Sequence, residues 1–455
     1  MNCTYCNLKG EIMKETDLTQ GKIFQKLIKF SLPMIAGNLL QQIYNLVDTL
    51  IVGRCLGADA LAAVGSAYTL MIFITSIIIG LCMGSGAFFS EDYGAGNQKK
   101  LKEDIWLSFW FILSVSVVIC AIIYPGMNFI LWILQTPKEL MALTREYVTV
   151  VFVGIIFVFL YNFFAYLLRS MGNSFMPLVF LAISSVLNIV LDIWFVAGLN
   201  MGVGGAALAT VIAQAVSGLG LLIYSMIKIP VLKNNHERTG FNIQRLKEII
   251  INDVATGIQQ SVMNFGILMI QGLVNSFGIT IMASFAAAVK IDTIAYMPAQ
   301  EFGNAYSLFV SQNYGADEKD RIRKGTHISF VISALFCVVI SLMIFIFAEN
   351  LMRIFIDADE IRIIAEGARY LKIEGSMYVG IGVLFLWYGY FRGINKPHIS
   401  LLLTVISLGT RVILSYTLAP HTPLGVTAIW SSIPIGWVLA DVVGLYLYMK
   451  IFNGR

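Results

Sequence analysis

The chain has 455 residues, of which 58% are hydrophobic and 13% are charged, and its mean hydropathy is +0.78. A composition this apolar excludes a soluble globular protein and favours a membrane protein with many spans. The net charge of +4 is modest and the basic residues are spread over short segments, so we expect no nucleic-acid partner.

The first 29 residues form a polar leader without the apolar core of a cleaved signal peptide, so we expect them to stay inside the cell. Cys3 and Cys6 form a C-x-x-C motif in this leader, but no second pair accompanies them, which argues against a zinc or redox site. The other cysteines are scattered and predict no disulfide framework.

Beyond the leader, the hydrophobic pattern predicts an all-α membrane protein with twelve transmembrane helices in two six-helix bundles. A polar linker at 229–246 separates the bundles at 30–228 and 247–450, and a tail follows at 451–455. The predicted spans are 30–53, 64–90, 105–124, 147–168, 177–198, 204–227, 251–276, 281–311, 326–347, 374–391, 398–419 and 424–450.

The distribution of Lys and Arg predicts the orientation of the spans. These residues are concentrated in the leader, in the linker and in the other segments on the same side, which places both termini in the cytoplasm. The segment 353–372 is an exception, because it carries basic and acidic residues on the opposite side.

The two bundles are predicted to be copies of each other. Tyr93-Gly94-Ala95 recurs as Tyr314-Gly315-Ala316, and Lys100-Leu101-Lys102 recurs at the same spacing as Arg321-Ile322-Arg323. Since each copy has an even number of spans, the copies share one orientation and are related by a pseudo-two-fold axis along the membrane normal. Such an arrangement suits alternating access, in which one bundle rocks against the other.

The first span carries a stripe of polar side chains. Asp48 lies well inside it, where a carboxylate costs about 2.5 to 3.5 kcal/mol on insertion scales. Asn45 and Gln41 precede Asp48 by three and seven residues and lie on the same face of the helix. Because this face is polar, it is not expected to face lipid. Pro33 near the start of the span permits a bend. The alternative is a stripe that only joins helices to one another.

A second intramembrane acid, Asp192, lies in the fifth span, with Asn188 one helical turn before it. The run of glycines at 202–205 opens the sixth span and is typical of close helix packing, and Thr210 follows. Asp48, Asn188, Asp192 and Thr210 offer oxygen ligands suited to a hard cation, and the carboxylates are equally suited to carry protons.

Several other charges fall within the C-terminal spans. We expect Lys290 and Asp292 to pair with neighbours inside the C-terminal bundle, Glu301 to behave similarly, and Arg411 and Asp441 on adjacent spans to neutralise each other. Glu91 and Asp92 at the end of the second span are expected to be solvated loop acids. No role is assigned to the four histidines, which have no ligand spacing.

Taken together, these motifs resemble the MATE (multidrug and toxic compound extrusion) family. The resemblance rests on FSLPMI, NLVDTLIVG and LGADALAAVG in the opening, the YGAGN loop, LRSMGNS, the N-x-x-x-D of the fifth span with GVGGAALAT after it, and KIDTIAYMPA. It covers the chain from about residue 17 onward. The seventh and tenth spans lack the acids of the NorM-like branch, so the pattern is closer to the MepA and DinF-like branches.

The resemblance implies an exporter of diverse, often cationic, drugs that is driven by inward sodium or proton flow. Asp48, Asn188, Asp192 and Thr210 match the cation site of the N-terminal bundle, Gln41 and Asn45 the neighbouring cleft, and Pro33 the bend of the first helix. A monomer in the cell membrane, with no cofactor beyond the coupling ion, is expected. Because the family's opening matches from Met13 onward, we expect residues 1–12 to be dispensable.

Two other functions remain open from the sequence. A flippase for a lipid-linked precursor belongs to the same superfamily, but it would need a strongly basic cleft, for which Lys290 and Arg411 are the candidates. A membrane-embedded enzyme would need a nucleophile with a base, or a metal motif such as H-E-x-x-H, and the sequence contains no such motif. The protein is therefore not expected to be an enzyme.

Overall fold

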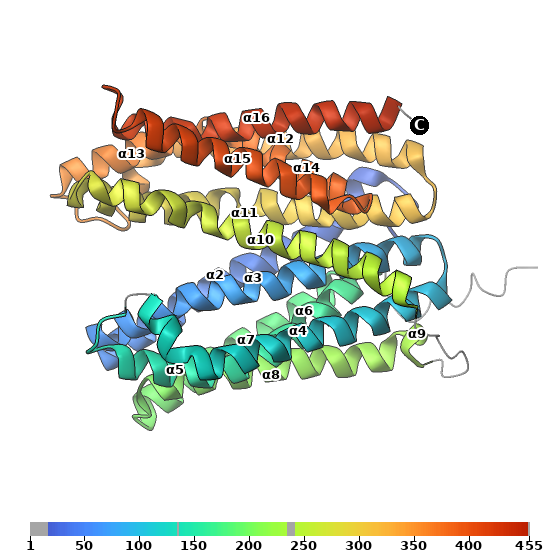
Figure 1. Ribbon diagram of the computed structural model, residues 1–455, viewed down its shortest axis with the longest axis horizontal. Coiled ribbons are helices and arrows are strands. Elements are labelled where there is room, and N and C mark those ends of the chain that lie inside the picture. The colour runs from blue at the N-terminus through green and yellow to red at the C-terminus, as the bar shows by residue number, and fades with distance from the viewer. Residues whose placement is uncertain (1–16, 134–135, 234–241, 454–455) are drawn as a thin grey trace, which may run out of the picture.

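The computed structural model describes residues 17–133, 136–233 and 242–453, and these residues are helical throughout, with short turns between the helices. Cys3 and Cys6 lie outside the described residues. Figure 1 shows two layers of long helices that run side by side. The N-terminal bundle comprises α2 (Ile23–Leu56), α3 (Ala58–Gly94), α4 (Gln98–Ile133), α5 (Met141–Val153), α6 (Ile155–Ser170), α7 (Phe175–Asp192), the π-helix η1 (Ile193–Gly198) and α8 (Gly202–Lys228).

The linker is partly helical, because α9 (Pro230–Lys233) precedes residues 234–241 and the next helix begins at Ile243. The C-terminal bundle comprises α10 (Ile243–Ser276), α11 (Ile279–Gly315), α12 (Lys319–Met352), α13 (Ile361–Gly375), α14 (Tyr378–Gly393), α15 (Pro397–Leu418) and α16 (Val426–Asn453). Counting α5 with α6 and α13 with α14 as broken spans, the described chain has the twelve predicted spans. The first helix begins at Ile23, ahead of the predicted start at Phe30.

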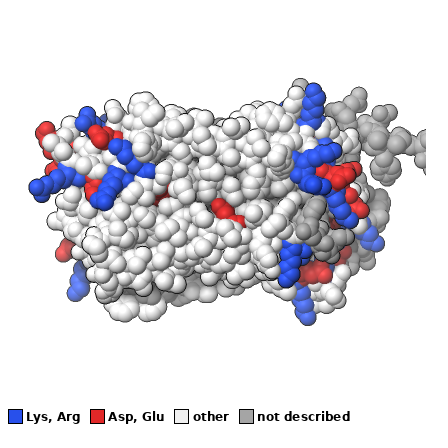
Figure 2. All heavy atoms as spheres, turned by 90° about the horizontal axis from the view of Figure 1, so that it is seen from above, with Lys and Arg blue, Asp and Glu red and all other residues white. Residues whose placement is uncertain are grey.

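On the face seen in Figure 2, the Lys and Arg side chains gather at the two ends of the molecule, and acidic side chains also appear in the belt between them. Eight helices are long and apolar enough to cross a membrane, and the bent pair α5 and α6 makes a ninth. The helices α2 and α10 and the pair α13 and α14 fall outside this set. In α2 the reason is the polar stripe identified in the sequence, since Gln41, Asn45 and Asp48 interrupt its apolar surface. The described chain begins and ends at the same end of the molecule, which we call the linker end.

Each bundle contains one broken span at the same place in the repeat. The α5 and α6 pair bends by 42° at Gly154, and α13 ends at Gly375, which is the counterpart of Gly154 at the spacing that relates Gly94 to Gly315. A Cβ atom at Gly154 would collide with the side chain of Gln214, and one at Gly375 would come within 2.7 Å of Ile344. Both breaks therefore occur where a side chain of a neighbouring helix lies close to the glycine backbone.

The pseudo-two-fold relation is visible where α3 and α11 cross at the linker end. A Cβ atom at Gly94 would collide with the carbonyl oxygen of Gln312, and one at Gly315 would collide with the carbonyl oxygen of Glu91. Glu91 and Gln312 are themselves counterparts in the repeat, so the two contacts are reciprocal. The repeated Tyr-Gly-Ala motif thus marks a point where the backbones of the two bundles approach very closely.

The first helix of each bundle crosses onto the other bundle. Leu27, Phe30 and Met34 near the start of α2 belong to the hydrophobic core of the C-terminal bundle. In the same way Ile249, near the start of α10, packs with Phe88 and Leu107 of the N-terminal bundle. The division at residues 229–246 therefore separates the sequence repeats, whereas the packed cores exchange the linker-end parts of their first helices.

The contacts at the linker end correct one prediction. Asp92, which we expected in a solvated loop, is only 1% exposed because the ends of α3, α4 and α10 cover it. Its carboxylate lies 3.0 Å from Lys100 Nζ. Glu91 is half-buried and accepts a hydrogen bond from Asn395 of the C-terminal bundle. Both acids therefore belong to the contact between the bundles.

Candidate functional site

The candidate site begins with Asp48, on the face of α2 that packs against α7. Asp48 Oδ1 is buried and has no hydrogen-bond partner among the described residues. Asn45 is half-buried and Gln41 is exposed, so the polar stripe runs from the interior of the bundle toward its surface. The helix passes through Pro33 without interruption. The bend at Pro33 and the cleft role of Gln41 and Asn45 stay predictions.

The second acid faces the first. Asp192 is 0% exposed and Asn188 is 2% exposed, and the side-chain oxygens of both lack hydrogen-bond partners among the described residues. The carboxyl groups of Asp48 and Asp192 are close enough to share a hydrogen bond once one of them carries a proton. The structure therefore brings together three of the four residues predicted for the cation site.

The position of Asp192 follows from the local helix geometry. It is the last residue of α7, and the chain continues as the six-residue π-helix η1. Short π-helical turns inside a span are often found at functional sites, because they widen the helix and shift the side chains on one face. The glycines of α8 allow this wider turn to pack closely. A Cβ atom at Gly205 would lie 2.7 Å from Met201 and 3.3 Å from Phe195 of η1.

Thr210, the fourth predicted residue, lies on α8, which packs against both α7 and η1. Its hydroxyl donates a 3.1 Å hydrogen bond to the carbonyl of Ala206, one turn earlier. No hydrogen bond joins Thr210 to either acid among the described residues. Its oxygen retains lone pairs, and its role in binding a cation stays a prediction.

Two tyrosines near the acids were not predicted from the sequence. Tyr44 lies one turn before Asp48 on α2, and Tyr147 comes from α5 and is 7% exposed. Both are close enough to interact electrostatically with Asp48, and Tyr147 is also near Asp192. The i, i+4 spacing of Tyr44 and Asp48 was available as a signal. Tyr147 reaches the site only through the packing of α5, which the sequence does not show.

The oxygen atoms of this site are suited to binding a monovalent cation or a proton. Two carboxylates and one amide supply buried oxygen atoms without partners, and buried polar groups in native proteins are nearly always satisfied. A single positive charge between the carboxylates would satisfy these atoms and relieve the repulsion between them. No group of three or more His, Cys, Asp or Glu side chains among the described residues is arranged for a metal ion.

In the C-terminal bundle, the predicted pairing of Arg411 with Asp441 is wrong. Asp441 Oδ1 is buried without a partner, and no ion pair joins the two among the described residues. Arg411 instead lies within electrostatic range of Asp292 and of Glu374, an acid that was not predicted from the sequence. The Nε atom of Arg411 has no hydrogen-bond partner among the described residues. The Arg411 side chain is only 8% exposed, because α15 presents it to the interior of the bundle, where these two acids lie.

The structure also shows where the other charged residues predicted in this bundle lie. Asp292 is 4% exposed and accepts a 2.6 Å hydrogen bond from the hydroxyl of Tyr378, so its predicted pairing inside the bundle is confirmed. Lys290 is exposed, because it points away from Asp292 on the opposite side of α11, and its predicted pairing inside the bundle is wrong. Glu301 accepts hydrogen bonds from Asn304, at 3.2 Å, and from Asn38 of α2, at 2.9 Å. It therefore lies between the bundles.

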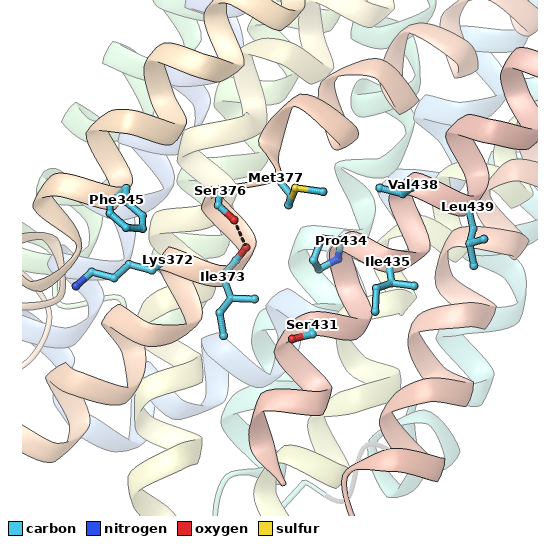
Figure 3. Close-up of a pocket in the computed structure, with 10 residues that line it drawn as sticks. All are labelled: Phe345, Lys372, Ile373, Ser376, Met377, Ser431, Pro434, Ile435, Val438 and Leu439. Carbon is cyan, nitrogen blue, oxygen red and sulfur yellow. Dashed lines mark hydrogen bonds between the residues drawn. The ribbon is translucent and has the colours of Figure 1, made fainter. Parts of the chain in front are cut away.

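A groove of about 630 Å³ lies on the apolar surface of the C-terminal bundle, away from the acids of the N-terminal bundle (Figure 3). The side chains that line it come from α12, α13, α16 and the turn between α13 and α14. Lys372 is its one charged residue, and its Nζ lies 3.8 Å from Glu349. The rest of the lining is apolar except for Ser376 and Ser431, so no acidic side chain is among the residues that line the groove.

Comparison with known proteins gives consistent matches. A family model described as MatE matches residues 33–194 and 255–417. The "Probable multidrug resistance protein YpnP" of Bacillus subtilis is 32% identical over 401 residues, which is 87% of this chain and 88% of the relative. The "Multidrug export protein MepA" of Staphylococcus aureus is 24% identical over 80% of each chain.

The fold has close counterparts among solved structures. One, described as "Outward-facing conformation of a multidrug resistance MATE family transporter of the MOP superfamily", superposes with a TM-score of 0.91. It is 23% identical, and the alignment covers 97% of this chain and 99% of that one. At this identity the likeness establishes the fold, with its twelve helices in two bundles.

Proposed function

Because the chain belongs to the MATE family of multidrug efflux transporters, we propose that it is a secondary active antiporter that exports diverse, often cationic, organic compounds in exchange for sodium ions or protons. In this proposal the two bundles rock against each other, the protein acts as a monomer in the cell membrane, and the linker end faces the cytoplasm. The coupling ion binds between Asp48 and Asp192, with Asn188 and Thr210 as further ligands or as residues that orient the acids.

The observation that carries the proposal is the pair of buried, partnerless carboxylates in the half of the bundle away from the linker end. Leaving such groups unsatisfied is costly, so a membrane protein retains them where a charge must bind and leave again. An ion bound there changes the charge of the N-terminal bundle. This change gives the ion a way to favour one arrangement of the bundles over the other.

The chemistry of the individual groups follows from this arrangement. When a proton enters, the two carboxyl groups form a hydrogen bond to each other, and the amide of Asn188 holds one of them in place. When sodium enters, the carboxylate, amide and hydroxyl oxygens supply ligands of the kind that hard cations prefer. The surrounding tyrosines and apolar helices keep water out, so the electrostatic interaction between the ion and the neighbouring charged groups is strong.

Uphill efflux from proteoliposomes tests the proposal. The purified protein is reconstituted, a fluorescent cationic dye is loaded, and sodium and proton gradients are imposed separately. Efflux against the dye gradient under at least one of them, and its collapse when that gradient is dissipated, is the expected result. If neither gradient drives efflux of any cationic dye while the protein remains folded, the proposal is wrong.

The flippase alternative is not favoured. The relatives described above are named for multidrug resistance or export. Of its two candidate cations, Arg411 is buried within electrostatic range of two acids, and Lys290 is exposed.

A further inference from the structure

The contact between the bundles at the linker end contains a largely buried bidentate ion pair. Arg245, in the first turn of α10, donates from Nε to Asp104 Oδ1 at 2.8 Å and from Nη2 to Asp104 Oδ2 at 2.5 Å. Asp104 comes from α4 of the N-terminal bundle and is 0% exposed. A bidentate pair of this kind is short, directional and strong, and separating it leaves a buried charge without a partner.

The surroundings hold Arg245 in this position. The side chain of Asn242 caps α10 and accepts hydrogen bonds from the backbone N–H groups of Gln244 and Arg245, both at 3.1 Å. The guanidinium also lies 4.4 Å from the ring centre of Phe88 and 3.7 Å from Asp92 Oδ2. Arg245 thus connects the start of α10 to the ends of both α3 and α4.

The start of α10 thus crosses onto the N-terminal bundle, and we call this contact the first crossing. The pseudo-two-fold axis relates it to a second crossing, where the start of α2 lies on the C-terminal bundle. There Arg321, the counterpart of Lys100, donates to the backbone carbonyl groups of Leu18, Gln20 and Gly21 at 2.8 to 3.0 Å. Asn313, the counterpart of Asp92, also donates to the carbonyl of Leu18, at 3.2 Å.

The two crossings therefore have the same geometry and different chemistry. The acceptors at the second crossing are neutral backbone groups, and glycine, Gly325, stands at the position that corresponds to Asp104. Of the two crossings, only the first is held, among the described residues, by a buried pair of opposite charges. Its strength depends on Arg245 of the C-terminal bundle and chiefly on Asp104 of the N-terminal bundle, with Asp92 farther away.

We infer that Arg245 and Asp104 form an ionic lock that keeps the linker end closed, and that this end opens only when Arg245 leaves Asp104. The inference rests on the proposed rocking of the bundles. In the closed arrangement the pair is shielded from water by Phe88 and the surrounding helix ends. When the bundles separate, water reaches both charges and solvates them, so the pair favours the closed arrangement and sets how often the linker end opens.

Distance measurements between two spin labels test the lock without any substrate or ion gradient. On a cysteine-free background of the full chain, Lys99→Cys and Lys319→Cys place labels on exposed positions of the two bundles at the linker end. Asp104→Asn and Arg245→Gln are each expected to raise the ratio of open to closed distances by about tenfold or more. Arg245→Lys, which keeps the charge without the bidentate geometry, is expected to give a smaller rise.

Two controls separate the lock from general damage. Glu248→Gln removes another partner of Arg245, 2.8 Å from Nη1, but this acid is on the same helix and half exposed, so no shift is expected. The double variant Asp104→Asn with Arg245→Gln is expected to shift the distances no more than the larger single effect, because both act on one interaction.

The lock is wrong if Asp104→Asn keeps the wild-type distances in folded protein, as judged by thermal unfolding and gel filtration. It is equally wrong if Glu248→Gln shifts them as much as Asp104→Asn. Neither result bears on the proposed antiport, whose own failure would appear as absent uphill efflux in the wild-type protein.

Discussion

Replacing either intramembrane acid by asparagine removes a negative charge from the site but keeps the size of the side chain and its ability to form hydrogen bonds. Two carboxylates within hydrogen-bonding reach repel by about 4 kcal/mol at an effective dielectric constant of about 20. A bound proton or sodium ion relieves this repulsion, which therefore drives ion binding. In Asp48→Asn or Asp192→Asn the repulsion is already gone. The affinity for the coupling ion should then fall by roughly 100-fold to 1,000-fold, since about 1.4 kcal/mol is tenfold.

The same change predicts opposite effects on stability and transport. Without ions, each variant should unfold at a temperature no lower than that of the wild type, because a buried repulsion has been removed. The increase in unfolding temperature that the coupling ion gives the wild type should disappear, because that increase reports ion binding. Uphill dye efflux from proteoliposomes should be abolished.

Thr49→Val serves as the matched control, because Thr49 is adjacent to Asp48 on α2 but exposed, with its hydroxyl bonded to the carbonyl of Asn45. It should retain both the ion-dependent stabilisation and efflux. If Asp48→Asn or Asp192→Asn keeps wild-type uphill efflux under either gradient, the organising role of the acid pair is refuted.

Three further sets of variants test individual contacts. Asn188→Ala and Thr210→Ala should reduce uphill efflux mildly if protons drive it and severely if sodium does, because each would then remove a ligand; equal effects under both gradients would contradict the assigned roles. Gly315→Ala should lower the unfolding temperature and separate the linker ends, since a Cβ atom there collides with the carbonyl of Glu91, whereas Gly409→Ala, which meets open space, should not. Tyr378→Phe removes the hydrogen bond to buried Asp292 and should destabilise the protein by about 1 to 3 kcal/mol in thermal unfolding; an unchanged unfolding temperature would show that the bond is not needed.

Several features of the site could be predicted from the sequence, because helical periodicity determines them. Asp48 with Asn45, and Asp192 with Asn188, share a face within a single helix, and a carboxylate inside an apolar span has few alternatives to a functional role. The repeated Tyr-Gly-Ala motif likewise predicted the two bundles. The reciprocal approach of Gly94 and Gly315 in the structure agrees with it.

Pairings between helices were predicted less well. Arg411 and Asp441 lie on adjacent spans, but the rotation of each helix decides which neighbours its side chains face, and Arg411 faces the region of Asp292 and Glu374. Asp92 looked like a loop acid because it precedes a turn. It is buried since α10 of the other bundle covers that turn.

The sequence by itself determined the membrane-spanning class, the twelve helices, their repetition and the two acids, because apolar length, helical period and the cost of a buried charge are properties of short segments. Only the tertiary structure decided that Asp48 and Asp192 face each other, that Tyr147 completes their surroundings, and that the first helix of each bundle packs on the other. These features depend on contacts between segments far apart in the chain, where the rotation and crossing of whole helices, which no local pattern encodes, bring the side chains together.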